Sequence, residues 1–119
     1  MKKNDILGDT TMPIHNKLVR DRIPEIIEKT GKNFSTKILA HDEYIQELKK
    51  KSNEELDEYM NAGNDEDALE ELADLLEIIH ALSECHGATF DRLEEIRKEK
   101  AEKRGGFKER IYLLEVEDE

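Results

Sequence analysis

Four carboxylates in this chain lie where helices are expected to be apolar. Downstream of residue 42, apolar residues recur at helical spacing, and at about 100° per residue Glu55 falls in the same stripe as Leu48 and Tyr59. Glu58 borders that stripe. An acidic side chain on the apolar face of a helix needs a partner there, so this pair is a candidate for chemistry.

The next helical segment repeats the anomaly. Glu71 interrupts a stripe that also contains Ala68 and Leu75, and Asp74 flanks the same side. Each segment therefore carries two acids at i, i+3 spacing, turned toward the side where helices meet. Several neighbouring acids fall on the opposite, solvent-facing sides: Glu54, Asp57, Glu70 and Glu77.

Four converging carboxylates repel one another strongly unless a cation lies among them. Oxygen ligands with no Cys or His select a hard ion, so the predicted metal is Mg²⁺, with Mn²⁺ as a substitute. The alternative is that these acids form ion pairs with arginine and lysine, which is common for a single inward acid. Two matched pairs on adjacent helices favour the metal.

A third helical segment carries cations on its apolar side. Arg97, Lys100 and Arg104 follow one stripe with Phe90 and Leu93. These cations could neutralise the four acids. They could instead bind phosphates whose remaining charge is held by the metal, as phosphoryl chemistry requires, and this second interpretation is favoured.

The elements that must position these residues are helices. Apolar periodicity predicts long helices over 42–63, 65–86 and 89–104, with Asp42, Asp65 and Thr89 as their N-caps. A shorter helix has Pro24 in its first turn and Gly31 as its C-terminal cap. The predicted fold class is all-α: an antiparallel helical bundle of three long helices plus a short N-terminal helix.

Two segments outside the helices have a different character. The β-branched run over 34–39 favours a brief strand, and the segment over 110–116 offers it a partner near the C-terminus. Residues 1–16 have no periodicity and are interpreted as a loose lead-in to a single helical domain over 17–119.

Composition narrows the function classes. The chain has 19 Lys plus Arg against 30 Asp plus Glu, a formal net charge of −11, so nucleic acid and anionic membranes are not expected as partners. No apolar run reaches bilayer length, and the single Cys85 excludes an intramolecular disulfide, which together favour a cytoplasmic protein. The segment over 65–86 is apolar around more than half of its circumference, which predicts a homodimer or higher homo-oligomer with this helix at its centre.

The acid pattern resembles that of a known family. EELDE over 54–58, twelve intervening residues and ELAD over 71–74 resemble the EExxE...ExxD signature of the all-α nucleotide pyrophosphohydrolase superfamily, which includes MazG-like enzymes and phosphoribosyl-ATP pyrophosphohydrolase. The opening KLVRDRIPEII and the closing KAEKRGGFKERIYL resemble its small house-cleaning, phosphoribosyl-ATP-pyrophosphohydrolase-like branch. The segment KKKSNEEL departs from the pattern, because it is unusually polar for a bundle helix.

The resemblance implies a helical bundle, often a dimer, that uses Mg²⁺ to split a nucleoside triphosphate into monophosphate and pyrophosphate. By position, it implies metal ligation and catalysis by the four acids, Glu55, Glu58, Glu71 and Asp74. It also implies phosphate binding by cations of the two end motifs, namely Lys17, Arg20, Lys100, Lys103 and Arg104.

Three functions remain open at this point. The first is Mg²⁺-dependent hydrolysis of a canonical or noncanonical nucleoside triphosphate, and the second is the same chemistry on phosphoribosyl-ATP in histidine biosynthesis. The third is a noncatalytic helical oligomer that binds a nucleotide or metal. His80 is expected to make a polar surface or intersubunit contact rather than a metal bond, and Cys85 to be a small core residue.

Overall fold

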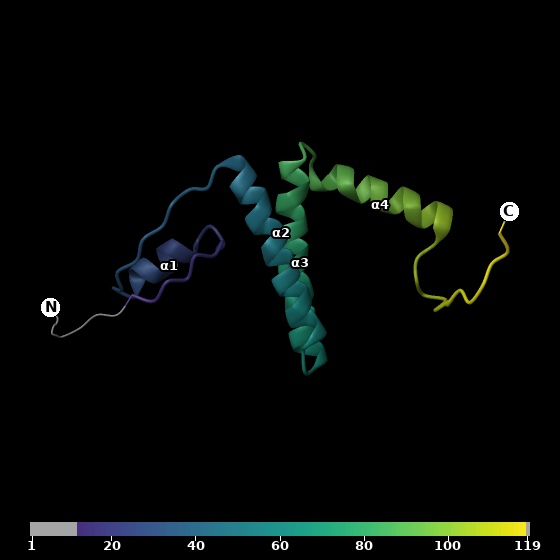
Figure 1. Cartoon of the computed structure of the whole chain (residues 1–119), viewed down its shortest axis with the longest axis horizontal. Coiled ribbons are helices and arrows are strands. Elements are labelled where there is room, and N and C mark those ends of the chain that lie inside the picture. The colour runs from purple at the N-terminus through teal and green to yellow at the C-terminus, as the bar shows by residue number, and fades with distance from the viewer. Residues whose placement is uncertain (1–11, 119) are drawn as a thin grey trace. The chain divides into compact units, whose positions relative to one another are not determined.

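The chain is all-α over the residues that its computed structural model describes, 12–118 (Figure 1). Four helices follow one another: α1 (Ile23–Lys29), α2 (His41–Met60), α3 (Asp65–Cys85) and α4 (Phe90–Arg104). The predicted all-α class agrees with this order. Residues 1–11 of the predicted lead-in lie outside the described part.

The predicted strand pairing is absent from the described residues. Residues 34–39 and 110–116 are both irregular and form no strand. High β-propensity reflects how well a side chain fits a packed, pleated surface, and in both segments nearly every side chain is exposed. The β-branched composition alone was therefore an insufficient signal.

Two compact units divide the chain, one up to Ile78 and one from Ile79, with the division inside α3. The first unit holds α1, α2 and most of α3. The second holds the last turns of α3, all of α4 and the C-terminal segment. The single domain expected over 17–119 stays a prediction.

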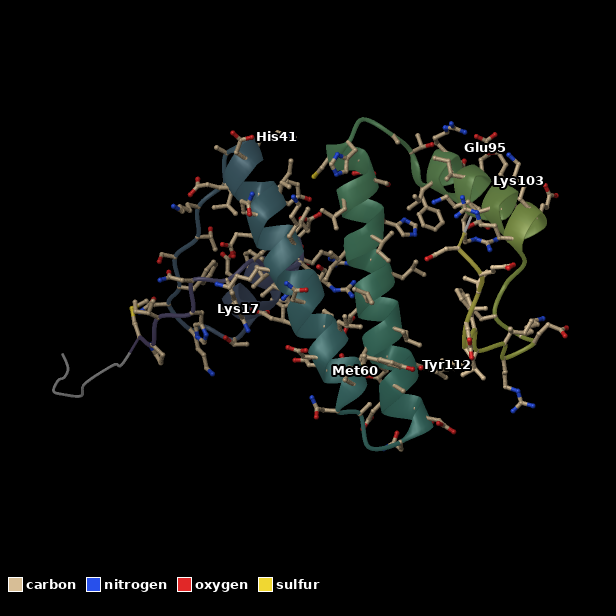
Figure 2. The ribbon with its side chains drawn as sticks, turned by 45° about the vertical axis from the view of Figure 1, so that its right-hand side comes forward. Lys17, His41, Met60, Glu95, Lys103 and Tyr112 are labelled. Carbon is tan, nitrogen blue, oxygen red and sulfur yellow. The ribbon has the colours of Figure 1, made fainter. Side chains whose placement is uncertain are left out.

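In the first unit, α2 and α3 lie side by side and run in opposite directions (Figure 1). Figure 2 follows α2 from His41 at its start to Met60 at its end, where a short turn leads into α3. Apolar burial is limited: among the described residues only Leu48 and Ile78 are fully buried hydrophobic side chains. By contrast, three leucines of α3 are exposed: Leu69, Leu72 and Leu76.

The helix starts agree with the predictions only in part. Thr89 does cap α4, since its hydroxyl accepts a hydrogen bond from the Arg92 N–H at 3.2 Å. Asp65 does not cap α3. Asn64 does so instead, because its side-chain oxygen accepts the Asp67 N–H at 2.8 Å while its amide donates to the Asp67 carboxylate at 3.1 Å.

α2 begins without a side-chain cap. Its first helical residue is His41 and its N-cap is Ala40, so Asp42, the predicted cap, lies inside the first turn. An acid in that position still interacts favourably with the positive end of the helix dipole. The sequence pattern therefore predicted the helix correctly but placed its N-cap at Asp42 instead of Ala40.

In the second unit, a glycine turn separates α3 from α4. Gly87 adopts φ +75°, its N–H donates to the Glu84 carbonyl at 3.0 Å, and the Ala88 N–H donates to the Ser83 carbonyl at 3.0 Å. These two bonds form a Schellman motif, which ends a helix and requires a left-handed residue. Beyond this turn the rings of His80 and Phe90 stack with centroids 3.7 Å apart and planes 9° from parallel, so His80 is used in packing.

Candidate metal centre

Three carboxylates from the α2–α3 hairpin converge. Glu55 on α2 and Glu71 and Asp74 on α3 each offer one oxygen, and these oxygens all lie within 4.8 Å of one another. We call these three residues the acid cluster. The helical periodicity that placed all three on facing stripes is the reason that they meet.

Glu55 is the buried member of the cluster. Its side chain is 9% exposed, and its Oε2 is enclosed without a hydrogen-bond partner among the described residues. A buried carboxylate oxygen without a donor is costly, and in native proteins such a group is explained by a bound ion or water, a catalytic role or local strain. This orphaned oxygen belongs to the same side chain that contributes to the cluster.

Burial and neighbouring charges raise the pKa values of two carboxyl groups in the cluster. The pKa of Glu71 is raised from 4.5 to about 7, first because it is desolvated, then because of the Glu58 charge and its hydrogen bond with Glu58, and then through Glu55. The pKa of Glu55 is also raised, first by burial and then by the charges of Glu58 and Asp74. The Lys51 charge and a hydrogen bond with Glu71 oppose that rise.

Glu58 stands at the edge of this arrangement. It is exposed, and it interacts with the cluster through its hydrogen bond and charge on Glu71. Of the four predicted acids, three therefore offer converging oxygens and the fourth is hydrogen-bonded to one of them. Their role as metal ligands stays a prediction.

The donor set fits Mg²⁺. All the converging atoms are carboxylate oxygens, which suit a hard divalent cation, and one of them is an enclosed oxygen that lacks a donor. A cation among them would offset the desolvation and the neighbouring acidic charges that raise the pKa of Glu71 to about 7. The four acids predicted to face solvent are exposed: Glu54, Asp57, Glu70 and Glu77.

One predicted phosphate-binding cation touches the cluster. The Arg20 guanidinium donates to Asp74 at 2.6 Å, although both side chains are substantially exposed. This contact also matches, for Asp74 alone, the alternative in which the acids pair with basic residues. Ion pairs this exposed contribute little stability, so the contact does not compensate for the burial of Glu55.

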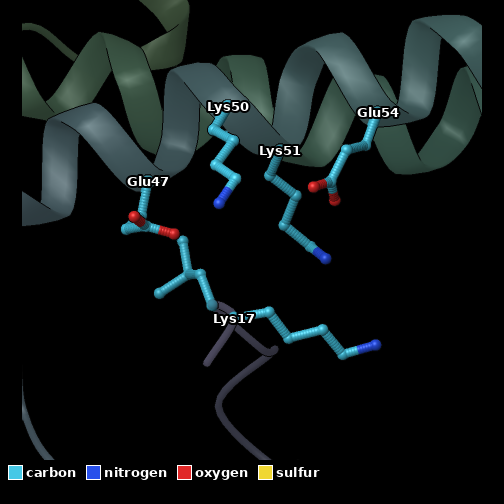
Figure 3. A pocket seen from close by; sticks show the side chains of 6 residues that line it. Lys17, Glu47, Lys50, Lys51 and Glu54 are labelled. Carbon is cyan, nitrogen blue, oxygen red and sulfur yellow. The ribbon is translucent and has the colours of Figure 1, made fainter. Parts of the chain in front are cut away.

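Lys17 lies in a hollow beside α2. Lys17 and Leu18 form one side of it, and the other side comes from α2 (Figure 3). The α2 residues that complete it are Glu47, Lys50, Lys51 and Glu54. We call this site the lysine hollow; Lys50 and Lys51 were not among the predicted phosphate-binding residues, and the only signal for them was the unusually polar segment KKKSNEEL.

The remaining predicted cations lie on α4, in the second unit. Arg97 is engaged by the carboxylate of Glu94, which it contacts at 2.6 Å and 2.9 Å. Three others are exposed on the last turns of the helix: Lys100, Lys103 and Arg104. Phosphate binding by these four residues stays a prediction.

Comparisons with known proteins give no relative: no protein-family model, no curated protein and no solved structure matches the chain. The family named from the acid motif therefore remains a resemblance. Among the helices of residues 12–118, none combines the length and apolar content that crossing a membrane would need.

Proposed function

We propose that this chain is a Mg²⁺-dependent nucleoside triphosphate pyrophosphohydrolase, which hydrolyses its substrate to a nucleoside monophosphate and pyrophosphate. The observation that carries the proposal is the unpartnered Oε2 of Glu55, on a side chain 9% exposed that converges with Glu71 and Asp74. The EELDE and ELAD motifs, whose pattern resembles that of the all-α pyrophosphohydrolases, supply these same residues.

The chain's own side chains have distinct tasks in this proposal. Glu55, Glu71 and Asp74 would hold the cation. Because the pKa of Glu71 is about 7, this carboxyl ionises near neutral pH and can then bind a cation. When bound, Mg²⁺ would neutralise phosphate charge and make water more acidic. Glu58, exposed at the edge of the acid cluster, would accept the proton of the attacking water.

Arg20 has a second task. Its guanidinium already lies 2.6 Å from Asp74, beside the acid cluster. Arginine binds phosphate through several directed donors, so Arg20 would hold a phosphate oxygen beside the cation. In a chain of net charge −11, such local cations are necessary for a polyanionic substrate.

The proposal extends to the assembly. We infer an antiparallel helical bundle completed by a second copy of the chain, because α3 leaves Leu69, Leu72 and Leu76 exposed at 65%, 41% and 48%. We also propose a cytoplasmic location, since the single Cys85 suits a reducing compartment. Burial of only two hydrophobic side chains in residues 12–118 is little for a stable helical domain.

A nucleotide panel tests the reaction. Canonical and modified nucleoside triphosphates, with phosphoribosyl-ATP as a further substrate, are incubated with Mg²⁺, and the products are identified by phosphorus NMR. Pyrophosphate should be the primary product, diphosphates should be poor substrates, and a chelator should abolish turnover. Glu71→Gln should remove activity whereas the exposed neighbour change Glu70→Gln should retain it.

Two results would contradict the proposal. Orthophosphate as the primary product would show a different site of attack on the phosphate chain. Nucleotide binding without turnover across the whole panel would favour the noncatalytic nucleotide-binding module instead.

A further inference from the structure

The lysine hollow is lined by three lysines from two separate segments. Figure 3 shows Lys50 and Lys51 extending from α2 toward the segment that carries Lys17. Lys49, the first lysine of the same run, does not line the hollow. The sequence KKK therefore presents two lysines to one site and one lysine elsewhere.

These lysines are not used in ion pairs. Within residues 12–118, no carboxylate lies within 4.0 Å of the amino group of Lys17, Lys50 or Lys51. Lys50 and Lys51 form no such pair although each lies three or four residues from Glu47 and Glu54 on α2, the spacing at which helical ion pairs form. α1 and α4 do form such pairs at that spacing.

The hollow is close to the acid cluster, in the same compact unit. Lys17 precedes Arg20 by three residues, so its Cα lies within about 11 Å of the Arg20 Cα. Arg20 in turn contacts Asp74 of the cluster. Lys51 lies one helical turn before Glu55 on the same side of α2. Its charge acts on the Glu55 carboxyl, which places the two within electrostatic range.

We propose that Lys17, Lys50 and Lys51 bind the part of a linear polyphosphate chain that extends beyond the acid cluster. The proposal rests on the proposed function and names the subsite for the phosphates that leave as pyrophosphate. Lysine provides compact point charges that suit phosphate oxygens without selecting a base. Glu47 and Glu54 lower the net charge of the lining, so the hollow favours a chain that arrives partly neutralised by Mg²⁺.

Binding of inorganic tripolyphosphate tests this subsite without a base and without turnover. The full chain is titrated with tripolyphosphate in the presence of Mg²⁺ by isothermal calorimetry. The double change Lys50→Gln and Lys51→Gln should raise the dissociation constant about 10-fold or more, because two charge-assisted contacts are lost. Lys50→Gln and Lys51→Gln are also measured singly. Lys49→Gln removes one charge, as each of these single changes does, from the adjacent helix position, and it should change the dissociation constant less than about 2-fold.

Equal weakening by Lys49→Gln and by either lining substitution would overturn the proposal, because only the overall charge would then matter. Wild-type chain that hydrolyses nucleoside triphosphates but shows no lysine-dependent binding would overturn the subsite and leave the proposed function intact. Lysine-dependent tripolyphosphate binding by a chain that turns over no nucleotide would instead support the subsite and contradict the proposed function. Circular dichroism checks that each variant is folded.

Discussion

Competition between a proton and a divalent cation at Glu71 gives a quantitative prediction. A cation needs the ionised carboxylate, but the pKa of Glu71 is raised to about 7 by desolvation and by Glu58 and Glu55. With that pKa, about 0.9 of the Glu71 population is ionised at about pH 8 and about 0.1 at about pH 6. The apparent association constant for Mg²⁺ should therefore fall about 10-fold between these pH values.

An ordinary acidic cluster would behave differently. A carboxyl with an unperturbed pKa near 4.3 is still almost fully ionised at about pH 6, so its affinity for Mg²⁺ would barely change over the same range. The pKa of Glu55 is also raised, which acts in the same direction. The change of about 10-fold in the association constant expected from Glu71 alone is therefore a minimum. Calorimetric titration with MgCl₂ at constant ionic strength measures the constant directly.

The same pKa predicts how stability depends on pH without metal. Because the folded-state pKa of Glu71 lies above its unfolded value of 4.5, the folded state binds more protons between about pH 4.5 and pH 7. The Glu71 contribution to stability is therefore fully present below about pH 4.5 and is lost as pH rises through about 7. Saturating Mg²⁺ should reverse this loss by linkage at the upper end of the range.

Glu71→Gln and Glu70→Gln form a matched pair for both measurements, since they are adjacent on α3 and only Glu71 belongs to the acid cluster. Glu71→Gln should weaken Mg²⁺ binding, reduce its pH dependence and flatten the metal-free stability curve measured by urea unfolding. Glu70→Gln should leave all three unchanged. A Mg²⁺ affinity that is independent of pH, or equal effects of the two substitutions, would refute the reasoning.

Three further predictions address other parts of the chain. Arg20→Ala should tighten Mg²⁺ binding by about 2-fold to 5-fold, because it removes a cation from beside Asp74, and should weaken nucleotide binding; calorimetry with each ligand measures both signs. Gly87→Ala should lower the free energy of unfolding by about 1–2 kcal/mol because of its left-handed backbone, whereas Gly63→Ala should change it by less than about 0.5 kcal/mol in urea titrations. Leu72→Glu should convert the proposed oligomer to a monomer in sedimentation experiments at micromolar concentration, and a wild-type monomer there would contradict the assembly.

The acid cluster was predictable from sequence because helical periodicity is a local property. Once two helices are adjacent, a residue's position modulo 3.6 decides whether it faces the neighbour, so Glu55 and Glu71 could be placed without knowing the turn between them. Helix starts were less predictable. Asn64 and Asp65 are adjacent and both suit an N-cap, and the choice depends on which residue adopts the extended backbone that precedes the first turn.

The lysine hollow was not predictable, because it depends on tertiary structure. A run of lysines on a helix is usually a solvated face, and nothing in KKKSNEEL shows that the N-terminal segment crosses beside it. The pairing of Arg20 with Asp74 depends on the same crossing, which brings together residues 54 positions apart. A local pattern can identify a charged side chain but not the distant segment that it meets.

The burial of Glu55 connects stability to the proposed function. A carboxylate that is 9% exposed, with one oxygen lacking a donor, weakens a domain in which Leu48 and Ile78 are the only fully buried hydrophobic side chains of residues 12–118. An apolar residue at position 55 would remove that penalty and continue the stripe of α2. Glu55→Leu should therefore stabilise the metal-free chain while abolishing its response to Mg²⁺. A gain in stability together with a loss of the Mg²⁺ response is expected if the Glu55 carboxylate binds a ligand and does not stabilise the fold.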